Sequence, residues 1–160
     1  MAVPMPSTRD RGVTTAASTQ TASSPAYEAF QILHFGFTIL PIAAGLDKFF
    51  QFLVNWEQYL APFFVRMMPA SQFMLIIGAI EIVAGFIVAI KPKIGAYLVG
   101  LWLMGIMANL MMIPRILDPA SRTWGLDIVL RNFGLMLGAF ALARLATQFE
   151  NAKRIHIASA

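Results

Sequence analysis

Glu81 is the side chain that most plainly calls for a chemical explanation, because it lies near the middle of the apolar run 73–90. A bare carboxylate is costly in lipid, so an intramembrane glutamate is protonated, paired with a cation or turned into a helix bundle. Such residues commonly mark binding sites and proton paths. The chemistry available to Glu81 therefore depends on which other polar groups reach the same depth.

Five further polar residues stand within or at the ends of apolar segments: Asp47, Lys48, Asn109, Asp127 and Arg131. Together with Glu81 they give three acidic and two basic side chains, so one negative charge stays unmatched if all of them ionise. The deepest carboxyl loses most solvation on ionising, which predicts that Glu81 holds a proton. Asp127 precedes Arg131 by four residues, the favourable order for an ion pair on one helix face.

Two interpretations of this polar set stay open. One is a pocket that faces the outer leaflet and binds a quinone-like head group, a small anion or a proton. The other is a satisfied network that fixes how apolar helices pack, as isolated polar residues do elsewhere.

His34 is the other intramembrane residue that can do chemistry. It is either a metal ligand or a hydrogen-bonded packing residue. The second histidine, His156, lies in a polar tail, so haem ligation by two histidines of the chain is not expected. The chain has no cysteine, which excludes disulfides and thiolate metal sites. We therefore predict no intrinsic cofactor and no metal, with a quinone or a lipid as the candidate ligands.

The composition indicates a membrane protein. Of 160 residues, 58% are hydrophobic and 12% charged, with a mean hydropathy of +0.68. Four segments reach the roughly 20 apolar residues that a bilayer-spanning helix needs: 27–50, 72–90, 94–113 and 127–146. The predicted fold is an all-α integral membrane protein with four transmembrane helices in an antiparallel bundle.

The remaining segments are short. Residues 1–24 form a flexible or partner-bound tail rich in small polar residues, 25–147 the transmembrane domain, and 148–160 a short polar tail. Ser24 and Pro25 suit the start of the first helix. Between the first two spans, Trp56, Tyr59 and Phe63 recur at helical spacing and predict a short interfacial helix, although Pro62 interrupts the period and an ordinary loop is the alternative.

The distribution of basic residues predicts the topology. The side with both termini and the second loop carries seven basic residues, Arg9, Arg11, Lys91, Lys93, Arg144, Lys153 and Arg154, against Arg66, Arg115 and Arg122 opposite. This favours cytoplasmic termini, in a bacterial inner membrane. Glu81 then lies about 13 Å deep in a core roughly 30 Å thick, and the polar set occupies the outer half of the bundle. The chain has no basic patch of the kind that would indicate nucleic-acid binding.

Small residues four apart predict close helix contacts: Gly85 with Ala89, and Gly134 with Gly138. The spacing does not say whether the partner helix belongs to this chain or to another subunit.

Three sequence pieces, AGLDKFF (44–50), GAIEIVAG (78–85) and DIVLRNFGL (127–135), resemble the DoxX-like family of small four-helix membrane proteins. The resemblance spans about 32–145. It implies a four-helix bundle, with some relatives linked to quinone-coupled oxidation of sulfur compounds or to membrane oxidoreductase complexes. The family-like polar positions are Asp47, Lys48, Glu81, Asp127 and Arg131, and the family gives none of them a catalytic role.

The function expected first is a small non-catalytic integral subunit of a larger respiratory or photosynthetic electron-transfer complex, which it stabilises or whose quinone site it shapes. Its partners would be the lipid bilayer and other membrane subunits. The alternatives are a DoxX-like quinone-linked oxidoreductase subunit that uses the polar intramembrane site, and a small transporter or proton path, for which no inverted repeat is visible.

Overall fold

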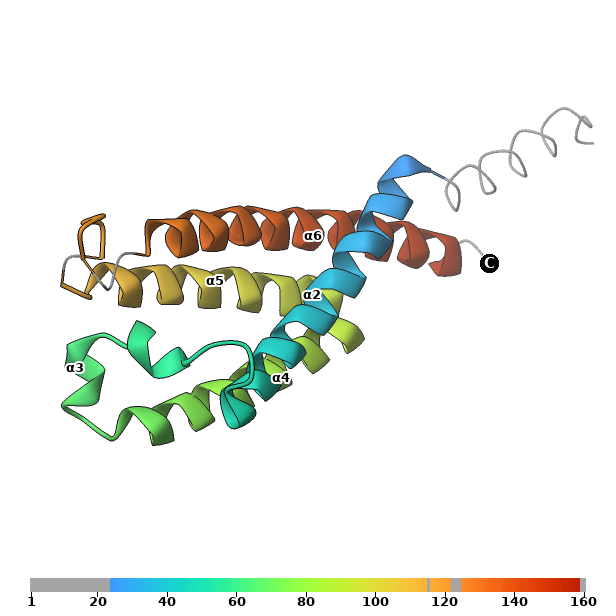
Figure 1. Cartoon of the computed structure of the whole chain (residues 1–160). Helices are drawn as coiled ribbons and strands as arrows, with labels where there is room; N and C mark the ends of the chain where they lie inside the picture. Colours follow the sequence, from blue (N-terminus) through green and yellow to red (C-terminus); the bar gives the residue numbers. More distant parts are fainter. Residues whose placement is uncertain (1–23, 115, 122–124, 159–160) are drawn as a thin grey trace, which may run out of the picture.

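The computed structural model describes residues 24–158 except 115 and 122–124. Over this part the chain is helical, with the elements α2 (Pro25–Phe50), η1 (Trp56–Tyr59), α3 (Pro62–Val65), α4 (Ala70–Ile90), α5 (Pro92–Met111) and α6 (Leu126–Ala158) (Figure 1). Four of these helices, α2, α4, α5 and α6, are long and apolar enough to cross a membrane. The expected four-helix membrane architecture is therefore confirmed. The expected tail 1–24 lies outside the described residues, apart from Ser24.

Local sequence explains where the long helices begin and end. The Ser24 hydroxyl accepts a hydrogen bond from the Tyr27 amide, and Pro25 occupies the first turn, as the sequence predicts. Lys91 ends α4 and directly precedes Pro92, the first residue of α5, so the two helices form a tight hairpin. The fourth helix runs further than predicted, since α6 continues to Ala158 where a polar tail was expected after residue 147.

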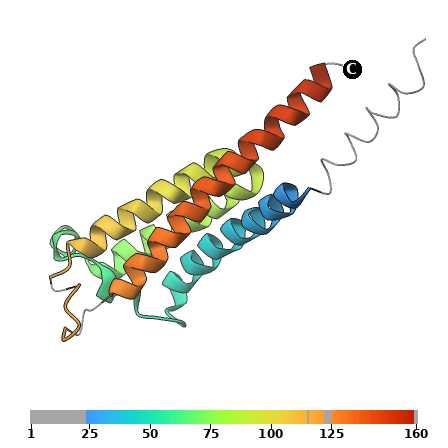
Figure 2. The same ribbon diagram turned by 90° about the horizontal axis from the view of Figure 1, so that it is seen from above.

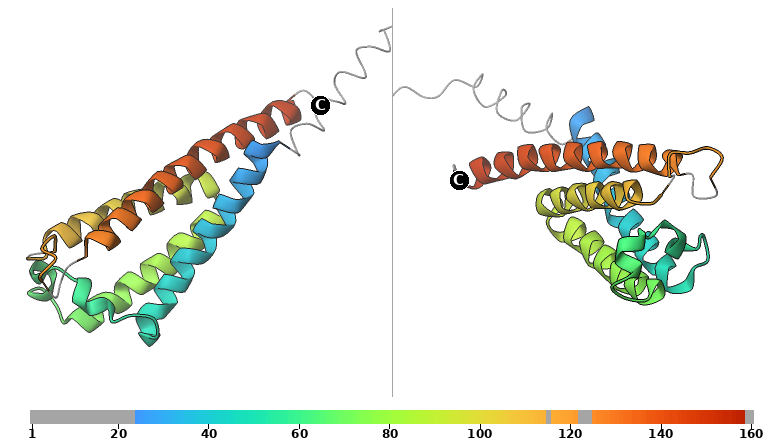
Figure 3. Two further views of the ribbon diagram at one scale, coloured as in Figure 1. Left: turned by 45° about the horizontal axis from the view of Figure 1, so that its top comes forward. Right: turned by 90° about the vertical axis from the view of Figure 1, so that its left-hand side faces the viewer.

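The helices pack mainly as two pairs, α2 on α4 and α5 on α6, linked by the α4–α5 hairpin (Figures 1 and 2). A buried apolar cluster joins all four helices, with Phe37 from α2, Val88 from α4, Val99 from α5 and Leu142 from α6 among its members. The start of α2 and the end of α6 lie at the same end of the bundle, which is the arrangement that four alternating spans require (Figure 3).

Glycines let α2 and α4 approach closely. A Cβ placed on Gly45 would lie 2.6 Å from the Gly78 carbonyl oxygen, and one on Gly78 would lie 2.7 Å from the Gly45 carbonyl oxygen. Gly85 meets α2 again, because its Cβ would lie 2.8 Å from the Thr38 carbonyl oxygen. Backbone therefore touches backbone along this pair, as small-residue packing in membranes allows.

The segment that joins α2 to α4 differs from the predicted interfacial helix. It contains two separate turns, η1 and α3, with Leu60 and Ala61 extended between them. Pro62 explains the break, because a proline disfavours helical backbone in the residue before it. Asn55 does cap the first turn, its side-chain oxygen accepting from the Glu57 amide.

Candidate functional site

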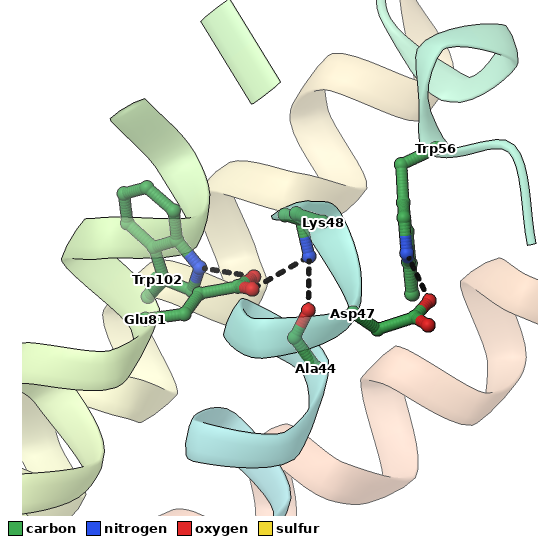
Figure 4. Close-up of polar contacts among 6 residues, drawn as sticks. All are labelled: Ala44, Asp47, Lys48, Trp56, Glu81 and Trp102. Carbon is green, nitrogen blue, oxygen red and sulfur yellow. Dashed lines mark hydrogen bonds and ion pairs between the residues drawn. The ribbon is translucent and has the colours of Figure 1, made fainter. Parts of the chain in front are cut away.

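The centre of the site is a buried ion pair between α2 and α4. Lys48 Nζ lies 2.6 Å from Glu81 Oε2, and the two side chains are only 5% and 8% exposed (Figure 4). Lys48 stands in the last turn of α2 and Glu81 near the middle of α4, directly beside the Gly45–Gly78 contact. The close approach of the two backbones is what brings the ammonium within reach of the carboxylate.

Both carboxyl oxygens of Glu81 have hydrogen-bond partners within the chain. Oε2 accepts from the Lys48 ammonium, and Oε1 accepts from the Trp102 indole N–H of α5 at 3.3 Å. Of the states open to an intramembrane glutamate, the structure thus shows the one in which Glu81 is paired with a cation inside the helix bundle.

An aromatic ring covers the ammonium on its other side. Lys48 Nζ lies 3.9 Å from the centre of the Trp56 ring, within the range of a cation–π interaction. The ammonium also approaches the Ala44 carbonyl oxygen at 3.5 Å. Lys48 is consequently held between the carboxylate of Glu81 and the indole of Trp56.

Asp47 organises the chain that leaves α2. Its Oδ1 accepts from the amides of Phe52 and Leu53, at 3.1 and 2.9 Å. Its Oδ2 accepts from Trp56 Nε1 at 2.6 Å (Figure 4). The turn begins at Gln51, which has a left-handed backbone with φ 49°. Asp47 therefore ties the connecting segment to α2 and sets the position of the indole that covers Lys48.

Asn109 ties the same segment to α5. Its Nδ2 donates to the Tyr59 carbonyl oxygen at 2.7 Å, and its Oδ1 accepts from the Ala61 amide at 3.0 Å. The Tyr59 carbonyl stands at the end of η1 and the Ala61 amide just before α3, so Asn109 supplies partners for two backbone groups at the ends of these turns. Both ends of the Asn109 amide are thus used to hold the segment over the bundle.

His34 has a packing role. Its Nε2 lies 3.0 Å from the Val88 carbonyl oxygen, and its ring stacks on Phe30. Val88 sits four residues before Pro92, which has no N–H to offer, so His34 provides the donor that this carbonyl lacks. Over the described part of the chain no group of three or more metal-binding side chains is found.

Asp127 and Arg131 lie apart from the site. Both are on α6 and exposed, and within residues 24–158, where described, they form no ion pair with each other or with the Lys48–Glu81 pair. Both residues stand near the start of α6, and their exposed side chains do not reach the Lys48–Glu81 pair.

The predicted packing residues divide in a similar way. Gly85 lies against α2, and a Cβ on Gly138 would lie 3.2 Å from the ring of Phe37. Ala89 is exposed, as is Gly134, around whose Cβ position nothing lies within 4 Å. Only one residue of each predicted pair therefore serves a contact within the chain.

Three residues outside the predicted polar set also contribute polar groups to the interior of the bundle. Trp56 and Trp102 bracket the ion pair, and Asn132 is a buried amide of α6, 8% exposed. The sequence does not predict that a tryptophan contacts a buried charge, because a lipid-facing or core position explains the same residue equally well. For Asn132 the sequence did offer a signal of a role in the interior. It lies between Val129 and Leu135, in the more polar first third of the span.

The site is covered and its polar atoms are bonded to one another. In the described residues, no fully buried polar side-chain atom lacks a hydrogen-bond partner. A hollow of about 680 Å³ beside the site is open and almost wholly apolar, and its lining consists of Ala43, Leu46, Asp47, Phe50, Phe52 and Leu53. Asp47 is the only charged residue in that lining, and both its carboxylate oxygens are already occupied.

The fold and the site define a small four-helix integral membrane protein with an internally paired polar centre. No family model, curated protein or solved structure matches the chain.

Proposed function

We propose that the chain is a small, non-catalytic integral subunit that stabilises a larger respiratory or photosynthetic electron-transfer complex in the membrane. The observation that carries the proposal is the saturation of its polar centre. Both oxygens of Glu81, both oxygens of Asp47 and both ends of the Asn109 amide are bonded to groups of the same chain. Such an arrangement favours a role in fixing helices over a role in holding a ligand.

The outward surface supports the role of a subunit. Only 11% of the apolar window of α2 is buried, and Ile32, Phe35 and Leu40 are each more than half exposed. Such a face is soluble in lipid and equally suited to pack against the helices of another subunit. The electron-transfer setting rests on the resemblance of 44–50, 78–85 and 127–135 to the DoxX-like family.

The proposed setting is a bacterial inner membrane, with both ends of the chain in the cytoplasm. The excess of basic residues on the side of the α4–α5 turn supports this orientation. Lys91 and Lys93 belong to that turn, and Arg144 lies toward the same end of α6.

Isolation from native membranes tests the proposal. A tagged chain, extracted in mild detergent and analysed by native mass spectrometry, should carry with it a stoichiometric set of larger membrane subunits with redox cofactors. Recovery of the chain without such subunits, in a detergent that keeps known respiratory complexes intact, would overturn the proposal.

A second measurement separates packing from quinone chemistry. The double variant Lys48→Met with Glu81→Leu removes both charges while keeping side-chain volume, so the complex should assemble and retain its quinone-dependent turnover. If the complex assembles normally but loses turnover, the polar centre takes part in the reaction and the quinone-linked oxidoreductase becomes the better account. Lys91→Met, at the other end of α4, is the matched control for loss of a positive charge.

A further inference from the structure

A small hollow lies between α2 and the end of α4. Its volume is about 270 Å³, and its lining consists of Gln31, His34, Phe35, Thr38 and Ala89. The first four residues belong to α2, and Ala89 is the next-to-last residue of α4. Pockets that enclose whole drug-sized ligands measure about 300–1,000 Å³, so this hollow suits the head group of a larger amphipathic molecule.

Two hydrogen-bond acceptors at this hollow are not used by the chain. His34 donates through Nε2 to the Val88 carbonyl oxygen at 3.0 Å, so Nδ1 of the neutral ring is an acceptor. Gln31 donates through Nε2 to the Tyr27 hydroxyl at 2.7 Å, which leaves its side-chain carbonyl oxygen. Neither atom has a hydrogen-bond partner in the described part of the chain. Unpaired acceptors are costly beside hydrocarbon, so the hollow suits a ligand that donates.

The end of α4 adds negative potential at the same place. A helix carries a partial negative charge at its C-terminus, where the last carbonyl groups lack helical partners. The Val88 carbonyl oxygen has the His34 ring as its donor, whereas no backbone amide among the described residues bonds the carbonyl oxygens of Ala89 and Ile90. A cation that carries N–H donors therefore complements this end of the hollow better than an anion does.

The hollow lies at the depth of lipid head groups. The 21 residues of α4 measure about 31 Å, close to the roughly 30 Å of a hydrocarbon core, so the helix ends at the membrane boundary. Ala89 is only about 3 Å along the helix from the exposed Lys91 that follows α4. Phe35, which is 71% exposed, and Thr38 lie farther toward the membrane centre. The polar end of the hollow thus faces head groups and its apolar end faces acyl chains.

We propose that this hollow binds the head group of an aminophospholipid, a lipid whose primary ammonium carries three N–H donors. The ammonium donates to Nδ1 of His34 and to the side-chain carbonyl oxygen of Gln31, beside the carbonyl end of α4. The phosphate stays in the head-group layer, where the basic residues of the α4–α5 turn also lie, and the acyl chains pass Phe35. The site belongs to the isolated chain, so it does not depend on the proposed attachment to a larger complex.

Lipid titration tests the chemistry of the head group. The chain is purified and delipidated in mild detergent, and is then titrated with phosphatidylethanolamine, phosphatidylcholine or phosphatidylglycerol of the same acyl chains. Native mass spectrometry counts the bound lipid. Phosphatidylethanolamine should bind about tenfold or more tightly than phosphatidylcholine, because the fully methylated ammonium of the latter donates no hydrogen bond.

Two results of the titration would overturn the proposal. Equal binding of the three lipids would mean that water is the donor at His34 and Gln31. Tightest binding of phosphatidylglycerol would mean that the basic turn attracts anionic lipid and that the two acceptors play no part.

Filling the hollow tests its location. Ala89→Phe places a large side chain in the hollow, and Ala79→Phe makes the same change at another exposed alanine of α4. The first variant should lower the affinity for phosphatidylethanolamine by about tenfold or more, and the second should leave it unchanged. Equal affinities in the two variants would contradict the proposal. Helical circular dichroism checks that both variants fold.

Removing one acceptor tests its contribution. Gln31→Leu takes away the side-chain carbonyl oxygen at similar volume and should reduce the preference for phosphatidylethanolamine over phosphatidylcholine. Gln58→Leu, an exposed glutamine of the connecting segment, is the matched control and should keep the full preference. An unchanged preference in Gln31→Leu would exclude this residue from the site and overturn the proposed geometry.

Discussion

The ammonium nitrogen of Lys48 lies 2.6 Å from Oε2 of Glu81, and neither side chain is more than 8% exposed. Each side chain compensates the charge of the other, which would otherwise lie unpaired in hydrocarbon. Removing one partner of a buried pair typically costs about 3–5 kcal/mol, whereas replacing both by apolar residues of similar volume is often neutral. We therefore expect Lys48→Met and Glu81→Gln to be strongly destabilising, and the double variant Lys48→Met with Glu81→Leu to unfold at a free energy close to that of the natural chain.

The measurement for this pair is the unfolding free energy in mixed detergent micelles, followed by circular dichroism. Lys93→Met, in the first turn of α5, is the control for loss of a lysine elsewhere. Additive costs in the double variant would show that the two residues act separately.

Asp47 is expected to hold the connecting segment in place. Asp47→Ala removes the acceptor for the amides of Phe52 and Leu53 and for the indole of Trp56. Hydrogen exchange at those two amides should rise by about tenfold or more, since hydrogen bonds to a charged group contribute about 1.5–3 kcal/mol. Asp47→Asn, which keeps one carbonyl acceptor, should show a smaller rise. Glu150→Ala, at the far end of the span, should leave both amides unchanged.

Asn109 is expected to hold the other end of the connecting segment in place. Asn109→Leu leaves the buried amide of Ala61 and the carbonyl of Tyr59 without partners, at a cost of about 1–3 kcal/mol for each orphaned group. The variant should unfold more easily and should be cleaved faster by protease within residues 51–69. Gln58→Ala, an exposed change in the same segment, serves as the control. Equal protease resistance in the two variants would rule out the tether.

Sequence reasoning places residues along a membrane helix better than it places them around it. The depths of Glu81, Asp127 and Arg131 follow from counting residues along each span. Their directions do not, because spans that are apolar on every side carry little periodic signal. Glu81 faces inward and pairs with Lys48, whereas Asp127 and Arg131 are exposed and lie apart from that pair.

The hydrogen-bond partners of the polar residues could not be predicted from the sequence either. Asn109 bonds only backbone atoms of the connecting segment, and such a contact depends on how that segment folds. Trp102 donates to Glu81 from an otherwise apolar helix, where an indole looks like any other core residue. By contrast, the start of the first helix at Ser24 follows from local chemistry, and this prediction is confirmed. The cap at Asn55 and the hairpin at Pro92 have the same kind of local cause.

The glycine contact between α2 and α4 predicts a sharp difference among alanine substitutions. Gly45→Ala and Gly78→Ala each drive a methyl group to within 2.7 Å of a backbone carbonyl oxygen, so the helices must separate and the Lys48–Glu81 pair must lengthen. Gly105→Ala meets nothing within 4 Å and should be neutral or stabilising by up to about 1 kcal/mol, the difference in helix propensity. The check is the unfolding free energy of the three variants. Equal values would show that α2 and α4 are not in close backbone contact.

Substitution of Asn132 is expected to change the unfolding free energy in a predictable direction. It lies near the apolar residues Val129 and Leu135 of α6 and is 8% exposed. Its side chain makes no hydrogen bond within the described part of the chain, and its amide is not fully enclosed, because every fully buried polar side-chain atom there has a partner. A polar group that lies in apolar surroundings without a partner costs about 1–3 kcal/mol. Asn132→Leu should therefore raise the unfolding free energy by about 1 kcal/mol, while Asn132→Ala, which leaves a cavity, should not. A loss of stability in the leucine variant would mean that the amide holds a bound water or another polar group that the helices enclose.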